Sequence, residues 1–259
     1  MQLSLAGACS GRKSRGPSRL SPIASYRVRH DESQQLSAER EMCNRYHPAR
    51  RDVFWNEFRA MPPENLPVGP IFPRKPGPFI RLLGDERQAV VGQWGLIPWF
   101  AKEAKLKYST NNARIEGILD GTSATFRDPW KRGQRCIIPA QSFDEPCWES
   151  GKNEWWRFRR ADGRAWGLAG LWSTWTDKSS GEIVESYTML TMNADAHPLM
   201  RRMHKPDPKL APHEQDKRSV IAIHPNDYDE WLSGPHDGAR ALVRLTAIED
   251  FDAAPDDAP

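Results

Sequence analysis

The sequence predicts an α+β fold: a single domain built on an antiparallel, barrel-like β-sheet with a few flanking helices. The apolar runs between residues 89 and 223 are mostly short and rich in β-branched and aromatic side chains, which is typical of strands. Only two segments are predicted to be helical, and the sequence shows no internal repeat and no long helical array. With 38% hydrophobic residues and 11 tryptophans, the 259 residues can bury a sizeable core.

The first helix is predicted over 52–61, where Phe54, Phe58 and Met61 recur at helical spacing. Seven prolines follow between residues 62 and 78, and they exclude a helix or a central strand there. A short second helix is predicted over 227–232, with Asn226 as its N-cap. The predicted strands, in chain order, are 89–94, 136–138, 154–158, 165–172, 186–191 and 219–223.

The two ends of the chain differ from this domain in composition. Residues 1–41 are rich in Arg, Ser, Gly and Pro, and we expect a disordered extension or a processed leader. Residues 42–248 are expected to form the folded domain, and the acidic segment 249–259 a disordered tail. Of 37 basic and 34 acidic residues, seven and four lie in 1–41, which leaves 30 of each in the rest. This balance argues against a high-affinity duplex binder and limits any nucleic-acid surface to a local patch.

The cysteines and the hydropathy pattern restrict the class of protein further. Cys9, Cys43, Cys136 and Cys147 show no CxxC spacing, and the sequence lacks the apolar core of a secretory signal. We therefore expect reduced thiols in a cytoplasmic protein, with no disulfide framework, no metal site and no cofactor. No apolar run approaches the roughly 18 residues that a membrane span needs.

The residues Met42-Cys43-Asn44-Arg45 form a plausible protein start inside the chain. If Met42 is removed, Cys43 carries a free amine and a free thiol on adjacent carbons. Only that arrangement closes a stable five-membered thiazolidine ring with an aldehyde, because the nitrogen of an internal cysteine is tied up in an amide. The position of the mature N-terminus therefore decides which chemistry is open to the protein.

Five segments, taken together, resemble one known family: MCNRY at 42–46, WGLIPWF at 94–100, TNNARIEG at 110–117, RCIIPAQSFDEP at 135–146 and TMLTMNADAHPLMRRMHKP at 188–206. The chain resembles the SOS response-associated peptidase (SRAP) family over about residues 42–232. Members of that family shield abasic sites in single-stranded DNA. The resemblance implies DNA containing such sites as the partner, and we expect a monomer that associates with the nucleoid when it binds DNA.

The resemblance also implies a catalytic set. Cys43 matches the crosslinking residue, Asn112 the asparagine of the Asn-Ala-Arg loop, and Glu145 the glutamate after the Ile-Pro strand. The histidine motif is rearranged to Arg-Met-His-Lys-Pro, so we assign His204 as the active-site histidine, with His197 as the alternative. The family usually has Trp after the glutamate, whereas this chain has Pro146.

These residue types fit the capture of an aldehyde. An α-amine, with an ordinary pKa near ~8, is partly neutral at pH 7 and can attack the carbonyl carbon to give an imine. The Cys43 sulfur then adds to that imine from the adjacent carbon, with a large gain from proximity. Glu145 is the candidate proton donor and acceptor, His204 a group near the sugar ring oxygen, and Asn112 an orienting group.

Residues beside this set are candidates for DNA contacts. Arg45, Arg114 and a lysine group that includes Lys105 are expected to neutralise phosphates. The segment that begins at Trp94 could stack bases or wedge strands apart through Trp94, Pro98 and Trp99. Recognition is expected to tolerate any sequence, because the reacting position has no base.

Three functions remain open from the sequence. The first is covalent capture of abasic sites by Cys43. The second is proteolysis, in its narrow form the autocatalytic cleavage of the Met42–Cys43 bond with a histidine as base. The third is a non-catalytic module that binds single-stranded DNA.

Overall fold

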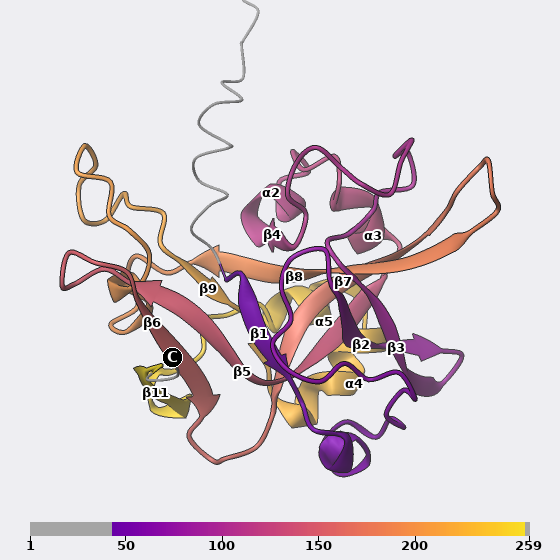
Figure 1. The fold of residues 1–259 in the computed structure, drawn as a ribbon, viewed down its shortest axis with the longest axis horizontal. Coiled ribbons are helices and arrows are strands. Elements are labelled where there is room, and N and C mark those ends of the chain that lie inside the picture. The colour runs from indigo at the N-terminus through magenta and orange to yellow at the C-terminus, as the bar shows by residue number, and fades with distance from the viewer. Residues whose placement is uncertain (1–42, 257–259) are drawn as a thin grey trace, which may run out of the picture. The chain divides into compact units, whose positions relative to one another are not determined.

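The structure, a computed structural model, describes residues 43–256 (Figure 1). Residues 1–42 and 257–259 lie outside the described part, and with them the predictions for the leader, for Met42 and for the last three residues. All element bounds below refer to the described residues. Within them, no helix is both long and apolar enough to cross a bilayer.

Five strands close into a barrel: β2 (Pro76–Leu83), β3 (Glu86–Trp94), β5 (Arg135–Cys147), β7 (Trp166–Thr176) and β8 (Ile183–Asn193). Each pairs with the next in the order β2, β3, β8, β7, β5, and β5 returns to β2. The predicted fold class is therefore confirmed. One pairing, β3 with β8, is parallel, because these two strands are far apart in sequence and no hairpin fixes their direction.

Six further strands extend this barrel. β1 and β6 both pair with β5, β11 pairs with β6, β10 with β7, and β4 and β9 with β8. β4 runs parallel to β8 and brings residues 112–114 alongside it. Their bounds are β1 Arg45–Pro48, β4 Asn112–Arg114, β6 Glu154–Arg160, β9 Arg218–Val220, β10 Ala222–Ile223 and β11 Phe251–Pro255.

The helices of the described residues are all short. The α-helices are α2 (Ile115–Leu119), α3 (Arg127–Lys131), α4 (Tyr228–Ser233) and α5 (His236–Ala241). The remaining helical turns are η1 (Arg51–Val53), η2 (Phe54–Phe58), η3 (Met200–Arg202), η4 (Pro225–Asp227) and η5 (Ile248–Asp250).

The two predicted helices are found with changes at their ends. The first is only the pair of turns η1 and η2, and it ends where Arg59 takes a left-handed backbone conformation with φ of 54°. Phe54 and Phe58 are buried as their spacing predicts. The second helix is α4. Asn226 is not its cap, because the His224 side chain accepts the Asn226 N–H and starts the preceding turn η4.

Two prolines of the predicted connector, Pro76 and Pro78, lie at the start of β2, which agrees with the prediction, because only a helix or a central strand was excluded there. The part of β2 that contains them pairs only with β3, and β5 joins only at Ile80. A proline lacks the N–H that a second neighbouring strand would need, and an unpaired edge makes no such demand.

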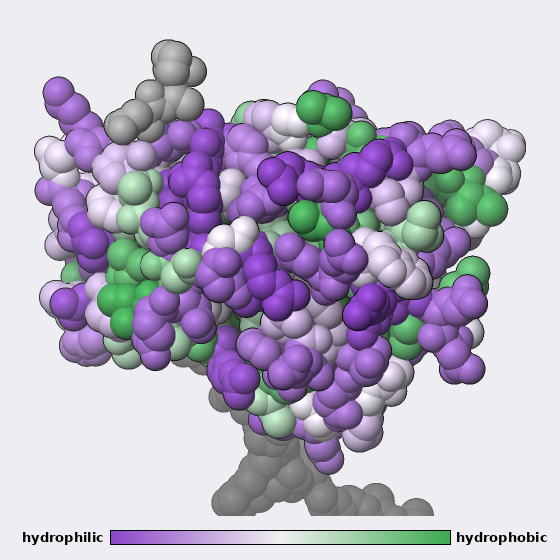
Figure 2. Space-filling model, turned by 90° about the horizontal axis from the view of Figure 1, so that it is seen from below, coloured by the Kyte–Doolittle hydropathy of each residue, from purple (hydrophilic) through white to green (hydrophobic). Residues whose placement is uncertain are grey.

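The core consists of two apolar clusters. One includes Phe58, Trp130 and Trp231, and the other includes Tyr46 and Trp94. Cys43 belongs to the second cluster. The face drawn in Figure 2 is largely polar, with apolar side chains in small groups, as expected when most apolar residues are inside.

The prediction of a disordered acidic tail was wrong for residues 251–255. They form β11, which pairs with β6 along its whole length. The ring of Phe251 packs against Phe143, Phe158 and Trp166, at centroid distances of 6.4, 5.8 and 5.4 Å. Composition suggested disorder, but one aromatic side chain and an available strand edge order the segment.

We expect Phe251→Ala to lower the free energy of unfolding by about 2–3 kcal/mol, below the usual cost for a fully buried ring because Phe251 is half-buried. Urea unfolding followed by tryptophan fluorescence measures this. The exposed neighbour Asp252→Ala is the matched control and should stay within about 0.5 kcal/mol. Equal stabilities of the two variants would contradict the packing role of β11.

Candidate active site

Cys43 lies two residues before β1 and is 1% exposed. β1 pairs antiparallel with β5 through Arg45 opposite Asp144 and Tyr46 opposite Phe143. Figure 1 shows β1 alongside β5. This register carries Cys43 to the end of β5 that holds Glu145.

Asn112 reaches the same point from β4. Its Nδ2 donates a hydrogen bond to the Cys43 carbonyl oxygen at 2.8 Å, and Asn111 Nδ2 makes a longer one at 3.5 Å. The Asn112 Oδ1 atom is buried and has no hydrogen-bond partner among the described residues. Asn112 therefore fixes the backbone of Cys43 and presents an unused acceptor beside it.

Glu145 and His204 form a buried pair. The His204 Nε2 atom lies 3.0 Å from Glu145 Oε2, and the two residues are 5% and 1% exposed. His204 adopts a left-handed conformation with φ of 62°, which is uncommon for a residue other than glycine. The backbone N–H of His204 donates to the Pro146 carbonyl at 2.6 Å, and the His204 carbonyl accepts from Lys217 Nζ at 2.6 Å. These backbone contacts aim the imidazole at Glu145.

The alternative histidine, His197, has a different environment. Its Nδ1 atom accepts the N–H groups of Leu199 and Met200 at 3.2 and 3.0 Å. Its Nε2 atom therefore carries the proton and donates to the Thr246 carbonyl at 2.9 Å. Both ring nitrogens bind backbone groups, so His197 organises a turn, and it is His204 that the fold brings to Glu145.

Burial shapes the acid–base properties of this set. Burial raises the pKa of Glu145, although the His204 imidazole and a hydrogen bond from Cys43 act in the opposite direction. Burial also raises the pKa of the Cys43 thiol, and the negative charge of Glu145 raises it further. The Cys43 thiol is therefore protonated at neutral pH, and a larger share of the Glu145 carboxyl is protonated than in water.

Asp144, the residue before Glu145, is a feature that sequence reasoning missed. Its carboxylate is fully buried and lies 2.5 Å from Arg45 Nε, 2.9 Å from Arg157 Nε and 3.4 Å from His47 Nε2. Burial alone would raise the pKa of Asp144, but hydrogen bonds from His47 and Arg157 and the nearby positive charges hold it below its usual range. The pKa values of two adjacent carboxyls are thus shifted in opposite directions, a pattern typical of acid–base sites.

The predicted DNA contacts are only partly available. Lys105 is exposed, Trp99 is 60% exposed, and Arg114 is partly exposed but ion-paired with Asp216. Arg45 is engaged by Asp144 and Asp256.

Stacking or wedging by Trp94 and Pro98 was a wrong prediction, because both residues are buried. Trp94 is fully inside the second cluster, and its Nε1 donates to the Asn111 carbonyl at 2.8 Å. It supports the asparagine loop instead. Its glycine neighbour and the apolar residues after it gave no sign of which side faces the core.

The described residues contain no group of three or more His, Cys, Asp or Glu side chains able to hold a metal ion. The three cysteines among them, Cys43, Cys136 and Cys147, are buried free thiols.

Fold and site together define a class: a single barrel-based domain with a buried cysteine, an amide and a carboxyl–imidazole pair at one point. Residues 42–255 match the family described as SOS response associated peptidase (SRAP). The chain belongs to this family, and the resemblance stated from the sequence is confirmed.

Relatives with known names and structures agree with this assignment. The chain is 30% identical to abasic site processing protein YoaM of Bacillus subtilis over 149 residues, which are 56% of this chain and 62% of the relative. It is 26% identical to abasic site processing protein HMCES of Gallus gallus over 204 residues, which are 69% of this chain and 55% of that relative. The matches thus span less than two thirds of these relatives.

Among solved structures, a protein of Bordetella bronchiseptica superposes with a TM-score of 0.74 at 36% identity, covering 83% of this chain and all of that one. A protein of Bacteroides thetaiotaomicron shares the fold with a TM-score of 0.64 at 19% identity, covering 82% of this chain and 91% of that one.

The electrostatic link between Glu145 and Cys43 is testable with a thiol reagent. We expect Glu145→Gln to raise the alkylation rate of Cys43 several-fold between about pH 7 and pH 9, because removing the carboxylate charge lowers the thiol pKa and only the thiolate reacts. Mass spectrometry after iodoacetamide treatment gives the rate for each cysteine. Glu149→Gln, beside Cys147, is the control and should leave Cys43 unchanged. An unchanged rate in Glu145→Gln would refute the coupling.

Proposed function

We propose that this protein captures abasic sites in single-stranded DNA covalently, through Cys43 as the N-terminal residue of the mature chain. The observation that carries the proposal is the convergence of Cys43, Asn112, Glu145 and His204 at one buried point. Family membership and relatives named as abasic site processing proteins support it. The proposal requires a free amine on Cys43, hence loss of Met42 or cleavage of the bond that precedes Cys43.

The reaction balances without an oxidant or a reductant. The Cys43 amine adds to the aldehyde carbon of the opened sugar, and loss of one water gives an imine. The Cys43 thiol then adds across the C=N bond: sulfur bonds to carbon and its proton ends on nitrogen. The net product is a thiazolidine and one water. The second addition is intramolecular and gains from proximity.

Glu145 is suited to the proton transfers. Its raised pKa keeps more of the carboxyl protonated than in water, so it can donate a proton to the sugar ring oxygen and to the departing hydroxyl. The 3.0 Å contact with His204 holds this carboxyl in place and gives it a proton-sharing partner.

Asn112 is suited to hold the nucleophile. Its Nδ2 atom fixes the Cys43 carbonyl, and its buried Oδ1 atom has an unused lone pair beside the same residue. A hydrogen bond from the Cys43 amine to Oδ1 would orient the nitrogen lone pair toward the aldehyde and satisfy a buried acceptor.

Proteolysis is the second candidate, in the form of self-cleavage before Cys43. The same residue would then act as a nucleophile on its own peptide bond, which fits its place between Asn112 and Glu145. The raised pKa of the Cys43 thiol is the opposite of what a protease acting on other proteins needs, because such enzymes depend on a stabilised thiolate. This observation favours capture over general proteolysis.

The proposal predicts a denaturation-resistant adduct when the full chain is expressed, processed and incubated with single-stranded abasic DNA. Mass spectrometry should find Cys43 as the first residue and, after reaction, a mass increase of the DNA minus one water. Cys43→Ala should abolish the adduct, and Cys147→Ser, which changes another buried thiol, should retain it. A full yield of adduct in Cys43→Ala would sink the proposal, and salt-sensitive binding without any adduct would favour a non-catalytic module.

Substitutions at the two histidines are expected to change different properties: the rate of adduct formation at His204 and the stability of the fold at His197. We expect His204→Gln to slow adduct formation by about 10²-fold, the lower end of the range for acid–base groups. His197→Gln should leave the rate of the folded protein unchanged and lower its unfolding free energy by roughly 1–3 kcal/mol, since buried N–H groups lose their acceptor. Single-turnover rates and urea unfolding of both variants test this, and the reverse pattern would make His197 the active-site residue.

A further inference from the structure

Beside the site lies a pocket of about 420 Å³ that the proposed reaction does not use. Three aromatic side chains line it, Phe72, Trp148 and Trp155, together with the amides of Asn44 and Asn153. The volume falls within the usual range of small-molecule pockets. No carboxylate is among its lining residues in the described part of the chain.

The pocket adjoins the site along two segments of chain. Asn44 follows Cys43, and Pro146 follows Glu145, and both line the pocket. One residue along a strand spans about 3.3 Å, and one nucleotide along a stacked strand spans about 3.4 Å. A sugar that reacts with Cys43 therefore places its neighbouring nucleotide within reach of the pocket.

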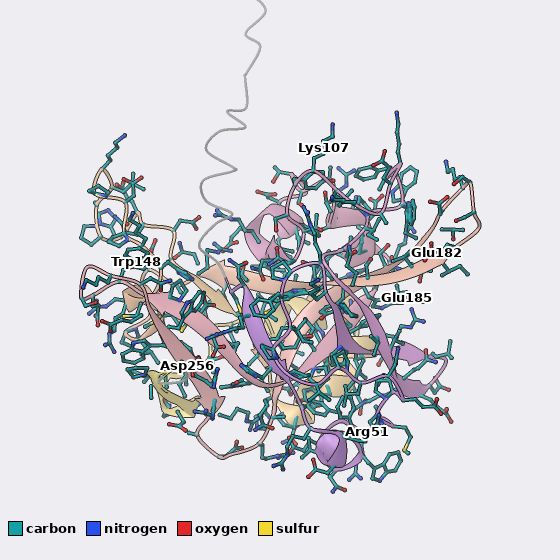
Figure 3. All side chains as sticks on the ribbon, viewed as in Figure 1. Arg51, Lys107, Trp148, Glu182, Glu185 and Asp256 are labelled. Atoms are coloured by element: carbon teal, nitrogen blue, oxygen red, sulfur yellow. The ribbon has the colours of Figure 1, made fainter. Side chains whose placement is uncertain are left out.

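Two cationic side chains contact the tryptophan rings that line the pocket. The Arg45 guanidinium carbon lies 5.1 Å from the centre of the Trp155 ring, and Lys205 Nζ lies 5.1 Å from that of Trp148. Such contacts fix the indole planes. Arg45 is held by Asp144 and Asp256, whereas Lys205 is exposed and can meet a phosphate. Figure 3 places Trp148 in this part of the molecule, at the end of the hairpin formed by β5 and β6.

The lining matches one class of occupant. Indole and phenyl faces stack on any base, and such stacking contributes to single-strand binding with little dependence on sequence. Asparagine amides offer both a donor and an acceptor to the edge of an unpaired base. An abasic site has no base of its own to bind, so the strand must be held through its neighbours.

We propose that this pocket receives the nucleobase of a nucleotide adjacent to the abasic site and thereby positions the open sugar at Cys43. The inference rests on the proposed function, because it is that reaction which places the lesion at Cys43. Stacking makes the pocket tolerant of sequence, while a missing neighbour base leaves it empty.

The first test varies the DNA. Two single-stranded oligonucleotides carry one reactive abasic site and, on its 5′ or its 3′ side, an unreactive tetrahydrofuran residue in place of the neighbouring nucleotide. We expect one of them to need about 10-fold or more higher concentration for half-maximal capture than the oligonucleotide with both neighbour bases, with the same maximal rate. Equal half-saturation for all three would overturn the proposal.

The second test varies the protein. Trp148→Ala should raise the half-saturating concentration of the intact oligonucleotide by a similar factor and have little further effect on the one that lacks the stacked base. Phe72→Ala, at a side chain 46% exposed, gives an independent variant if the first folds poorly. The control is Trp55→Ala, 54% exposed on η2 and outside the pocket lining. Equal losses on every oligonucleotide would overturn the proposal.

Binding without chemistry separates this inference from the proposed function. An oligonucleotide with tetrahydrofuran at the lesion cannot form an adduct, and fluorescence anisotropy reports its affinity for wild type and Cys43→Ala. Adduct formation with no dependence on neighbour bases overturns the pocket alone. Base-dependent binding that Trp148→Ala weakens, with no adduct from reactive DNA, supports the pocket as a base site and refutes covalent capture.

Discussion

The pairing of β1 with β5 is the constraint on which the site depends. Arg45 stands opposite Asp144 in this register, and the fully buried carboxylate of Asp144 binds Arg45 and Arg157. A buried carboxylate without its partners would cost several kcal/mol, so the ion pairs fix the register strongly. Because a shift of one residue turns every side chain of a strand to the other face, this contact decides that Cys43 meets Glu145.

The surroundings of the two neighbouring carboxyls, Asp144 and Glu145, also shift their pKa values in opposite directions. Hydrogen bonds and nearby cations hold the pKa of Asp144 below its usual range, whereas burial raises the pKa of Glu145 against the opposing effect of His204. Asp256 extends this network from the other end of the chain, since it accepts hydrogen bonds from both Arg45 and Arg157. The C-terminal strand β11 is therefore coupled to the site through the arginines, which explains why a segment that looks disordered by composition is part of the domain.

Prediction from the sequence succeeded where a single local pattern or motif was enough to identify a strand or a site residue. Long β-rich runs gave β7 and β8, and the family resemblance selected the residues that the fold brings together. Prediction from the sequence failed where a contact between residues far apart in the chain decides whether a segment is ordered or buried. The partners that order β11 lie about 100 residues earlier, at Phe143 and Phe158. Similarly, no local pattern distinguishes a buried Trp94 from an exposed Trp99.

A buried, protonated Cys43 fits the proposed reaction better than a thiolate would. Addition of a thiol across an imine moves the thiol proton to nitrogen, so no free anion has to persist in the apolar surroundings that raise the pKa of Cys43. A thiol with a raised pKa is also slow to oxidise or alkylate, because those reactions require the thiolate. In the proposed reaction the amine acts first on the aldehyde, and the imine that forms then presents the electrophilic carbon beside the sulfur. On this proposal, burial protects the thiol until the aldehyde has reacted with the amine.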